Sequence, residues 1–276
     1  MPSRKITIKE IEAKHALGIS GMKELDYAFN PYLGCFHGCL YCYAIDLSNK
    51  EISSNWGNTV YVRMNVLDLL KKEIHTYKRG IVGVSSITDP YHAIEGKYKI
   101  TGNAVDFLAS NGFYVTVQTK SPLALRDMGI FIKHRKNVDI GYTITTLNSE
   151  ISKKIEPYAP LPETRLRAIK KFSSNGINSW IFMGPIIKNI NDNLDNIEKI
   201  IKFASDNNIR VIYDFFKDYS GPRKYMDNTG YLVSDSSWSA YIERNIKKIA
   251  DMYGVKCVSE YDEWKYEFGL RQKTLF

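Results

Sequence analysis

The chain contains no apolar run near the roughly 18 residues needed to cross a bilayer, and it has no internal repeat or low-complexity tract. Its first residues, MPSRKITIKEIEAK, alternate charged and apolar side chains. A signal peptide would need a continuous apolar core in this place. These absences argue against a membrane-spanning or secreted protein. We therefore expect a folded cytoplasmic protein with no membrane partner.

Cysteine is scarce, with four among 276 residues, and three of the four (Cys35, Cys39 and Cys42) lie within eight residues. Four cysteines in a secreted chain would suggest two disulfides. A tight group in a chain without a signal peptide indicates reduced thiols that act as ligands instead. Cys257 stands far away, and the sequence has no further cysteine-rich segment that could hold an auxiliary cluster.

Acidic residues are outnumbered, with 30 Asp and Glu against 38 Lys and Arg, which gives a net charge of +8. Such an excess favours attraction to a polyanion such as DNA or RNA. The basic residues are scattered, however, and clusters such as Lys133–Lys136 are short. A generally basic surface explains the same numbers, so charge alone leaves nucleic-acid binding open.

Short β-branched and aromatic runs alternate with helical patterns, which is typical of parallel βαβ units. A first strand ends within Asp26–Asn30, and five more are predicted at Gly80–Ile87, Phe113–Thr119, Val138–Thr145, Asn178–Ile187 and Arg210–Phe216. Helices are predicted at Asn65–Tyr77, Asp192–Asp206 and Ser237–Tyr253 from apolar residues at helical spacing.

Six such strands predict an α/β fold, a partial (β/α)6 barrel of the TIM type with a C-terminal extension. We divide the chain into an N-terminal extension at residues 1–25, a barrel core at 26–216 and a helical, aromatic extension at 217–276 that closes the barrel. The cysteine segment follows the first strand. It should therefore lie at the mouth of the barrel, where loops after the carboxyl ends of parallel strands build the site.

The spacing of Cys35, Cys39 and Cys42 favours a [4Fe-4S] cluster. Cubane clusters take thiolate ligands and usually four of them, so three close cysteines leave one iron open for chemistry. Gly34 and Gly38 would relieve crowding in the tight loop. The alternative is a zinc site completed by His37 or Cys257, although zinc sites usually pair two ligand halves at a distance and no second half exists here.

The motif Cys35-x3-Cys39-x-Tyr41-Cys42 resembles the signature of the radical S-adenosylmethionine (SAM) superfamily. Further stretches resemble the branch that contains spore photoproduct lyase. They are Thr59–Asn65, Thr88–Tyr91, Gln118–Lys120, Tyr142–Thr145, Glu156–Pro157, Arg165–Leu166 and Gly184–Ile186.

The resemblance implies an oxygen-sensitive enzyme that binds a [4Fe-4S] cluster and SAM. It would cleave SAM reductively to a 5′-deoxyadenosyl radical, with electrons from a ferredoxin- or flavodoxin-type donor. The radical would then abstract hydrogen from a substrate, for which a nucleic acid or nucleotide is our leading candidate. Two alternatives remain, a zinc-stabilised nucleic-acid-binding module and a cluster protein without SAM turnover.

Residue roles follow from the resemblance. Tyr41 would pack near the adenine and Thr88 would hold the SAM head group, whereas Asp89 fits a binding role and a turn role before Pro90 equally well. Lys120, after a predicted strand, would pair with the methionyl carboxylate, with a solvated loop lysine as the alternative.

Thr143 and Thr145 alternate along a predicted strand and should face the barrel interior near the ribose or carboxylate, with ordinary strand packing as the alternative. Arg165 is a further ligand candidate, and it could instead pair with Glu156. Ile186 would contact the adenine, although a strand-ending turn also explains its segment.

Ser86 weakens one part of the resemblance. Photoproduct lyases carry a cysteine near the cofactor that returns a hydrogen atom to the product radical, and alignment on Thr88 and Asp89 places Ser86 there. A serine O–H bond is too strong for that task. The sequence thus predicts radical generation but casts doubt on photoproduct repair.

Overall fold

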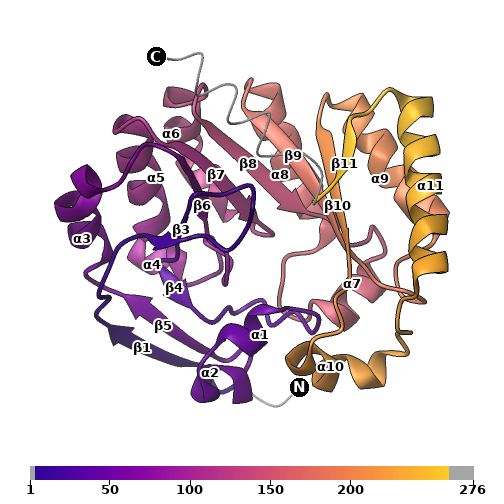
Figure 1. The fold of residues 1–276 in the computed structure, drawn as a ribbon, viewed down its shortest axis with the longest axis horizontal. Helices are drawn as coiled ribbons and strands as arrows, with labels where there is room; N and C mark the ends of the chain where they lie inside the picture. Colours follow the sequence, from indigo (N-terminus) through magenta and orange to yellow (C-terminus); the bar gives the residue numbers. More distant parts are fainter. Residues whose placement is uncertain (1–3, 261–276) are drawn as a thin grey trace.

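The computed structural model describes residues 4–260, and its framework is a curved sheet of eight strands (Figure 1). The order is β11-β10-β9-β8-β7-β6-β3-β2, and every neighbouring pair is parallel except β2 and β3. The strands are β2 (Gly18–Ile19), β3 (Tyr27–Phe29), β6 (Ile81–Val84), β7 (Tyr114–Thr119), β8 (Val138–Thr143), β9 (Asn178–Ile186), β10 (Arg210–Phe215) and β11 (Cys257–Ser259).

All six predicted strands are present as β3 and β6 to β10 in one parallel array, which confirms the partial barrel. Strands β9 and β10 each end one residue earlier than predicted, and two other strands end earlier by two or three residues. Strand β6 ends at Val84 instead of Ile87, and β8 ends at Thr143 instead of Thr145. Past β6, Ser86 N donates to the Asn30 side chain at 2.9 Å, whereas past β8, Ile144 N still donates to Phe182 O of β9 at 2.9 Å.

Helices cover the convex side of the sheet (Figure 1). The three predicted helices are present, and Ile197, Ile201 and Ala204 form part of the buried face of the second, as expected. They and the others are α1 (Ala44–Leu47), α2 (Lys50–Ser54), α3 (Val66–Glu73), α4 (Glu95–Tyr98), α5 (Ile100–Ser110), α6 (Met128–Lys133), α7 (Ser149–Ile155), α8 (Pro162–Ser174), α9 (Leu194–Asp206), α10 (Ser220–Met226) and α11 (Ser236–Tyr253). Short 3₁₀ turns span Ile74–Thr76, Pro122–Asp127 and Asp227–Thr229.

Helix ends follow their capping residues. The side chain of Asn193 accepts hydrogen bonds from Asp195 N and Asn196 N at the start of α9, and Asp235 caps Trp238 N at the start of α11. Helix α11 ends at Gly254, whose φ of +63° suits a left-handed C-terminal residue. These caps fix where each helix starts and thus which face packs on the sheet.

A second, small sheet was not predicted. Strand β5 (Thr59–Arg63) pairs in parallel with β1 (Thr7–Ile11) and antiparallel with β4 (Tyr32–Leu33). It lies beside the helices α1 and α2 at one edge of the barrel (Figure 1). Because β4 leads directly into the cysteine segment, this sheet anchors that segment from outside the barrel.

The chain beyond residue 216 forms α10, α11 and β11, and β11 extends the main sheet beside β10. Residues 261–276, which belong to the predicted C-terminal extension, lie outside the described part of the chain. Among residues 4–260, no helix combines the length and apolar character that a membrane span requires.

Candidate metal centre

The three motif cysteines lie in the segment between β4 and α1, and two glycines shape its turns. Gly34 has φ +78°, and a Cβ there would meet Thr59 O at 2.4 Å. Gly38 has φ +59° and its Cβ would lie 3.0 Å from the Tyr158 ring. Both positions combine left-handed backbone with close contacts, as expected from the sequence.

Protein contacts hold this segment in place without help from a metal. The Trp56 indole donates to Cys39 O at 3.0 Å, and Leu40 N donates to Ile155 O at 2.9 Å. The Thr88 hydroxyl donates to Gly34 O at 2.6 Å. The cysteines are therefore presented by a pre-formed loop that is tied to three other parts of the fold.

The thiols of Cys35 and Cys39 are buried, with 7% and 6% of their surface exposed. Burial raises the pKa of all three motif thiols, and that of Cys39 to about 12. The metal-free loop thus keeps these groups protonated, and iron binding releases their protons. In residues 4–260, no three His, Cys, Asp or Glu side chains gather closely enough to hold a single metal ion.

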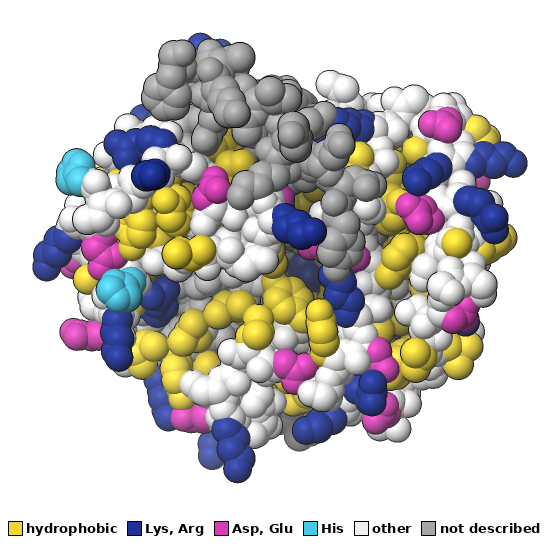
Figure 2. Space-filling model, viewed as in Figure 1, with side chains coloured by type: hydrophobic (Ala, Val, Ile, Leu, Met, Phe, Trp, Pro, Cys, Tyr) yellow, Lys and Arg dark blue, Asp and Glu magenta, His cyan; other side chains and the backbone are white. Residues whose placement is uncertain are grey.

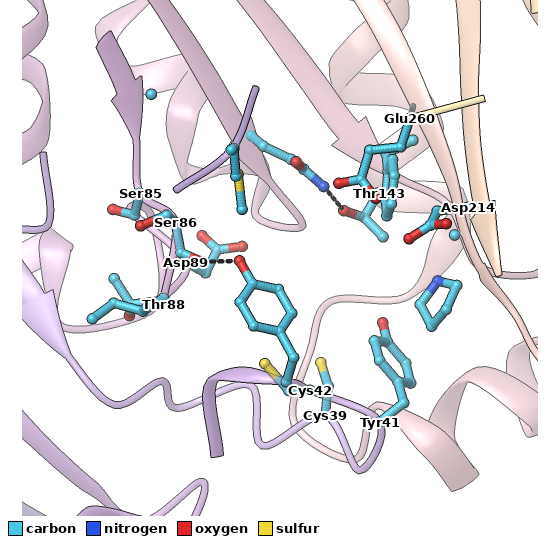
Figure 3. A pocket seen from close by; sticks show the side chains of 18 of the residues that line it. Cys39, Tyr41, Cys42, Ser85, Ser86, Thr88, Asp89, Thr143, Asp214 and Glu260 are labelled. Carbon is cyan, nitrogen blue, oxygen red and sulfur yellow. Dashed lines mark hydrogen bonds between the residues drawn. The ribbon is translucent and has the colours of Figure 1, made fainter. Parts of the chain in front are cut away.

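The cysteines line one end of a cavity of about 550 Å³ formed by the carboxyl ends of the strands. Figure 2 shows the molecular face with its central hollow, rimmed on one side by hydrophobic side chains. In Figure 3, Cys39 and Cys42 point from the loop into this space, with Thr88 and Asp89 at one wall and Asp214 and Glu260 at another. The predicted site residues that line it are Cys35, Cys39, Tyr41, Cys42, Thr88, Asp89, Lys120 and Thr143.

Three predicted binding residues, Thr145, Arg165 and Ile186, do not line the cavity. Thr145 lies past the end of β8, so strand alternation no longer sets its direction. Its hydroxyl donates to Glu156 at 2.5 Å. Ile186 packs in the main hydrophobic core with 1% of its surface exposed, while Gly184 and Pro185 before it do reach the cavity.

Glu156 is the hub of a buried network behind the cysteine segment. The Tyr41 hydroxyl donates to its Oε1, and Arg165 Nη2 lies 2.5 Å from its Oε2. Lys120 Nζ lies 4.0 Å from Oε1. Burial would raise the pKa of Glu156, but the charges of Arg165 and Lys120 lower it to about 2.

Arg165 is fully buried and its guanidinium is held inside the protein. Besides Glu156, it donates to Pro160 O at 2.6 Å and to Thr143 O at 3.2 Å. Its ion pair with Glu156 is therefore present, whereas direct contact with a cofactor stays a prediction. Arg165 therefore contacts cavity-lining residues only indirectly or through the backbone. It bonds to the carbonyl of Thr143, and its partner Glu156 contacts Tyr41 and Lys120.

Lys120 is a cation that lines the cavity beside the cysteines. Its side chain is 15% exposed, and it lies 5.5 Å from the centre of the Tyr41 ring. Burial would lower the pKa of Lys120, but its electrostatic interactions with Cys39 and Glu156 raise it. Lys120 therefore remains charged beside the cysteines, where an anionic group of a bound molecule would meet it.

Asp89 ties three segments together. It accepts hydrogen bonds from the Thr119 hydroxyl at 2.7 Å, from Lys120 N at 2.7 Å and from Tyr91 N at 2.9 Å. His37 Nδ1 lies 3.3 Å from Asp89 Oδ2. Burial opposes ionisation, yet the charge of His37 and these hydrogen bonds hold the pKa of Asp89 below its usual range. The bond from Tyr91 N shows Asp89 in the turn role before Pro90.

The far end of the cavity contains Trp180, Phe182 and Phe215, which supply aromatic surface, and Asp214 and Glu260, which supply carboxyl groups. Sequence reasoning missed Trp180, Phe182, Asp214 and Glu260. Trp180 and Phe182 alternate along β9, and Asp214 lies near the end of β10. Period-two spacing and strand-end position were the signals that could have identified them. Burial and the neighbouring Asp214 raise the pKa of Glu260 to about 8.

Below Trp180, a buried polar cluster fills the barrel. Asp139 is 0% exposed and accepts hydrogen bonds from Thr116 Oγ1 at 2.6 Å and from Trp180 Nε1 at 3.1 Å. Arg210 Nη2 lies 3.4 Å from it. Gly141 makes room for the indole, because a Cβ there would lie 2.4 Å from Trp180. The cavity therefore ends at Trp180.

The family model for the radical SAM superfamily matches residues 29–210. The chain belongs to the radical SAM superfamily. This match contains the cysteine segment and the strands β6 to β9 in full, and it includes one residue each of β3 and β10. It confirms the resemblance drawn from the cysteine motif.

A curated relative is similar to this chain in sequence, and two solved structures share its fold. The uncharacterized protein MJ0683 of Methanocaldococcus jannaschii is 34% identical over 253 residues, which span 89% of this chain and 94% of the relative. A structure of spore photoproduct lyase with bound AdoMet and dinucleoside spore photoproduct has a TM-score of 0.71 at 12% identity, over 93% of this chain and 82% of the lyase. SuiB of Streptococcus suis bound to S-adenosylmethionine has a TM-score of 0.61 at 14% identity, over 86% and 52% of the two chains.

Radical SAM enzymes use a [4Fe-4S] cluster and SAM, and the protein is an enzyme of this kind. The residues present fit these cofactors. Three buried thiols face one cavity, and a cubane can present three separate irons to them. A zinc-stabilised binding module, the alternative drawn from the sequence, is therefore wrong.

Proposed function

We propose that Cys35, Cys39 and Cys42 hold the cluster, and that SAM and a substrate share the cavity beside them. One observation carries this proposal: the three thiols, the Lys120 ammonium and an aromatic, carboxyl-bearing end all line the same space of about 550 Å³. When bound, the cofactors supply a 5′-deoxyadenosyl radical by reductive cleavage of SAM. The reaction is the abstraction of a hydrogen atom from the substrate. We propose that the enzyme acts in the cytoplasm.

The side chains near the cysteines suit the polar end of SAM. Lys120 offers a positive charge to its carboxylate, and Glu156 holds that lysine within 4.0 Å. Thr88 and Thr143 also line the cavity. Gln118 Nε2 donates to Thr143 Oγ1 at 3.0 Å, which orients the hydroxyl. Gly184 permits close backbone approach by the adenosine part.

The far end supports a substrate with a flat ring and N–H donors, and a nucleobase has both. Trp180, Phe182 and Phe215 offer surfaces for ring contact. Asp214 and Glu260 are acceptors for ring amines when ionised. We therefore propose that the substrate is a nucleotide or nucleic acid whose base enters the cavity, while phosphates stay outside near the basic surface.

Photoproduct repair by thiol hydrogen return is not part of this proposal. Ser86 lines the cavity, and Asn30 Nδ2 donates to its hydroxyl oxygen at 3.2 Å. Among the described residues around the cavity, the motif cysteines alone carry thiols. Cys257 lies on β11, away from this lining. The substrate radical would need another hydrogen source or another fate.

The test begins with anaerobic reconstitution, which should give about four irons per chain. Dithionite and SAM should then yield 5′-deoxyadenosine. Cys39→Ala should abolish both cluster binding and this product, whereas Cys257→Ala should leave both unchanged. A Cys39→Ala protein that still forms 5′-deoxyadenosine would overturn the proposal. A reducible cluster without this product would instead indicate a cluster protein without SAM turnover.

The substrate class has its own test. Oligonucleotides and nucleotides deuterated in the sugar and base are incubated with the reduced enzyme and SAM. Deuterium should appear in 5′-deoxyadenosine, detected by mass spectrometry, if the radical abstracts from the labelled molecule. Formation of 5′-deoxyadenosine without deuterium from any nucleotide tested would reject the nucleotide assignment and leave radical generation intact.

A further inference from the structure

A small exposed surface packs on the cysteine segment, and none of its residues is among those that line the cavity. It is called the cover patch here and consists of Arg4, Lys5, Pro157, Tyr158 and Leu161. The N-terminal end of the chain, which supplies Arg4 and Lys5, lies on the side of the molecule that carries α1, α2 and α10 (Figure 1). Segment 157–161 follows α7, whose last residue, Ile155, accepts a hydrogen bond from Leu40 N.

Direct contacts join the cover patch to the cysteine segment. Arg4 Nη2 donates to Phe36 O at 2.9 Å, and the Arg4 guanidinium lies 3.7 Å from the centre of the Tyr158 ring. Tyr158 N donates to His37 O at 3.2 Å. The patch is therefore fixed relative to the cysteines and is not a loosely attached loop.

The layer between the cover patch and the metal centre is thin. Gly38 precedes Cys39 directly, and a Cβ on Gly38 would lie 3.0 Å from Tyr158 Cδ2. The exposed Tyr158 ring therefore packs directly on the residue before Cys39. Electron tunnelling slows steeply with distance, so a donor that docks on Tyr158 would lie close to the cysteine segment.

The chemistry of the patch is that of a transient protein contact. Tyr158 is 49% exposed and Leu161 is 36% exposed, and Pro157 and Lys5 are exposed as well. The five patch residues carry two positive charges and no negative charge. The nearby Glu156 is buried and paired with Arg165, and the exposed Glu163 on α8 accepts a hydrogen bond from the Ser149 hydroxyl. An apolar centre beside positive charge suits a partner with an acidic rim. The net charge of +8 acts in the same direction over longer distances.

We propose that the cover patch is the docking surface for an acidic one-electron donor protein of the ferredoxin or flavodoxin type. The inference rests on the proposed function, because the donor serves the same metal centre. One electron leaves the donor, which is oxidised, and enters the cluster for each SAM molecule cleaved. The opposite side of the cysteine segment faces the cavity, which substrate and SAM occupy, so the donor approaches from the outer side.

Two variants test the surface without removing a hydrogen bond made by a side chain of the patch. Lys5→Glu reverses an exposed charge, and Leu161→Glu adds a negative charge beside Tyr158. Lys136→Glu is the matched control, because Lys136 is exposed and precedes β8 at the opposite end of the strands. Each protein is reduced either with photoreduced flavodoxin at low ionic strength or with dithionite, which needs no docking. Stopped-flow bleaching of the cluster and 5′-deoxyadenosine formation are measured.

Both patch variants should be reduced by flavodoxin at least about fivefold more slowly than wild type, with unchanged dithionite-driven product. Added salt should slow the wild type towards the variants. The Lys136→Glu protein should match the wild type with both reductants. Equal flavodoxin rates in the wild type and both patch variants would overturn the docking surface. Absence of product from wild type with dithionite would overturn the proposed function instead.

Discussion

At the scale of single residues, Glu156 joins the cysteine segment to the barrel. Glu156→Gln keeps the shape of the side chain but leaves Arg165 as a buried cation without a carboxylate. We expect the free energy of unfolding to fall by about 3 kcal/mol. Urea unfolding followed by tryptophan fluorescence measures this change.

The control for Glu156→Gln is Glu163→Gln, on the exposed first turn of α8, which should change stability by less than about 0.5 kcal/mol. The double variant Glu156→Gln/Arg165→Gln should recover part of the loss, because it removes the unpaired charge. If the double variant is no more stable than Glu156→Gln, the effect comes from packing and not from charge.

His92 is a second residue whose effect on stability can be measured, through its pH dependence. It is fully buried between Tyr32 and Phe36, and burial, together with the charge of His37, lowers its pKa to about 3. The unfolded chain takes up a proton near pH 6.5 while the folded chain does not, so stability falls as the pH drops through this window. From pH 7.5 to 5.5, His92 should account for a loss of about 1.4 kcal/mol.

Metal-free His92→Phe should lack this increment when its unfolding free energies at the two pH values are compared with those of the wild type. His75→Gln, which replaces an exposed histidine, serves as the control and should retain the increment. A His92→Phe protein with the same pH dependence as the wild type would show that the buried imidazole accepts its proton in the folded state.

The positions of some site residues relative to the cavity could be predicted from the sequence, and those of others could not. The cysteine ligands form a local motif, and Thr88 and Lys120 follow buried strands, so short-range pattern placed them beside the cavity. Arg165 and Thr145 could not be placed in this way. Their directions depend on where β8 ends and how α8 packs against it, which are long-range properties.

At the scale of elements, the packing of β8 against β9 fixes the barrel floor. Gly141→Ala would put a methyl group into the Trp180 indole, which a Cβ would approach to 2.4 Å. We expect the free energy of unfolding to fall by about 1–3 kcal/mol. Displacement of the indole from Asp139 should also shift the tryptophan emission maximum.

Gly129→Ala is the matched control, because a Cβ at this position in α6 meets nothing within 4 Å. It should leave stability unchanged or raise it by up to about 1 kcal/mol, since alanine favours the helix. If both variants unfold alike, the contact between Gly141 and Trp180 does not restrict the strand pair.

Elements with strong local patterns were predicted, and elements made by distant pairing were not. Helix α9 carries apolar residues at helical spacing, and its core face was read directly from the sequence. Strand β1 pairs with β5, beginning with Thr7 opposite Thr59, and most of its residues are exposed. Strand β11 has three residues and exists through its pairing with β10. Such strands have little signal of their own.

At the scale of the whole molecule, the packing that stabilises the fold is separate from the residues of the metal centre. In the described chain, the main hydrophobic core contains none of the motif cysteines. Removal of iron by a chelator should therefore leave the far-UV circular dichroism nearly unchanged, unlike a zinc finger, which unfolds without metal. Tryptophan fluorescence should rise, because Trp56 donates to Cys39 O and would lie beside a cluster held by Cys39.

Reconstitution with iron and sulfide should quench this fluorescence again, which excludes irreversible damage as its cause. Cys39→Ala provides the control, since its emission should not respond to the chelator. Loss of the circular dichroism signal together with the iron would show that the cluster is needed for folding.

The floor made by Trp180 and Asp139 also shapes the reaction cycle. Because the interior is filled at that end, molecules cannot pass through the barrel from one side to the other. Under the proposed function, methionine, 5′-deoxyadenosine and the altered substrate would leave from the end where SAM and the substrate enter. These products would then compete with the next SAM molecule for the space beside Lys120.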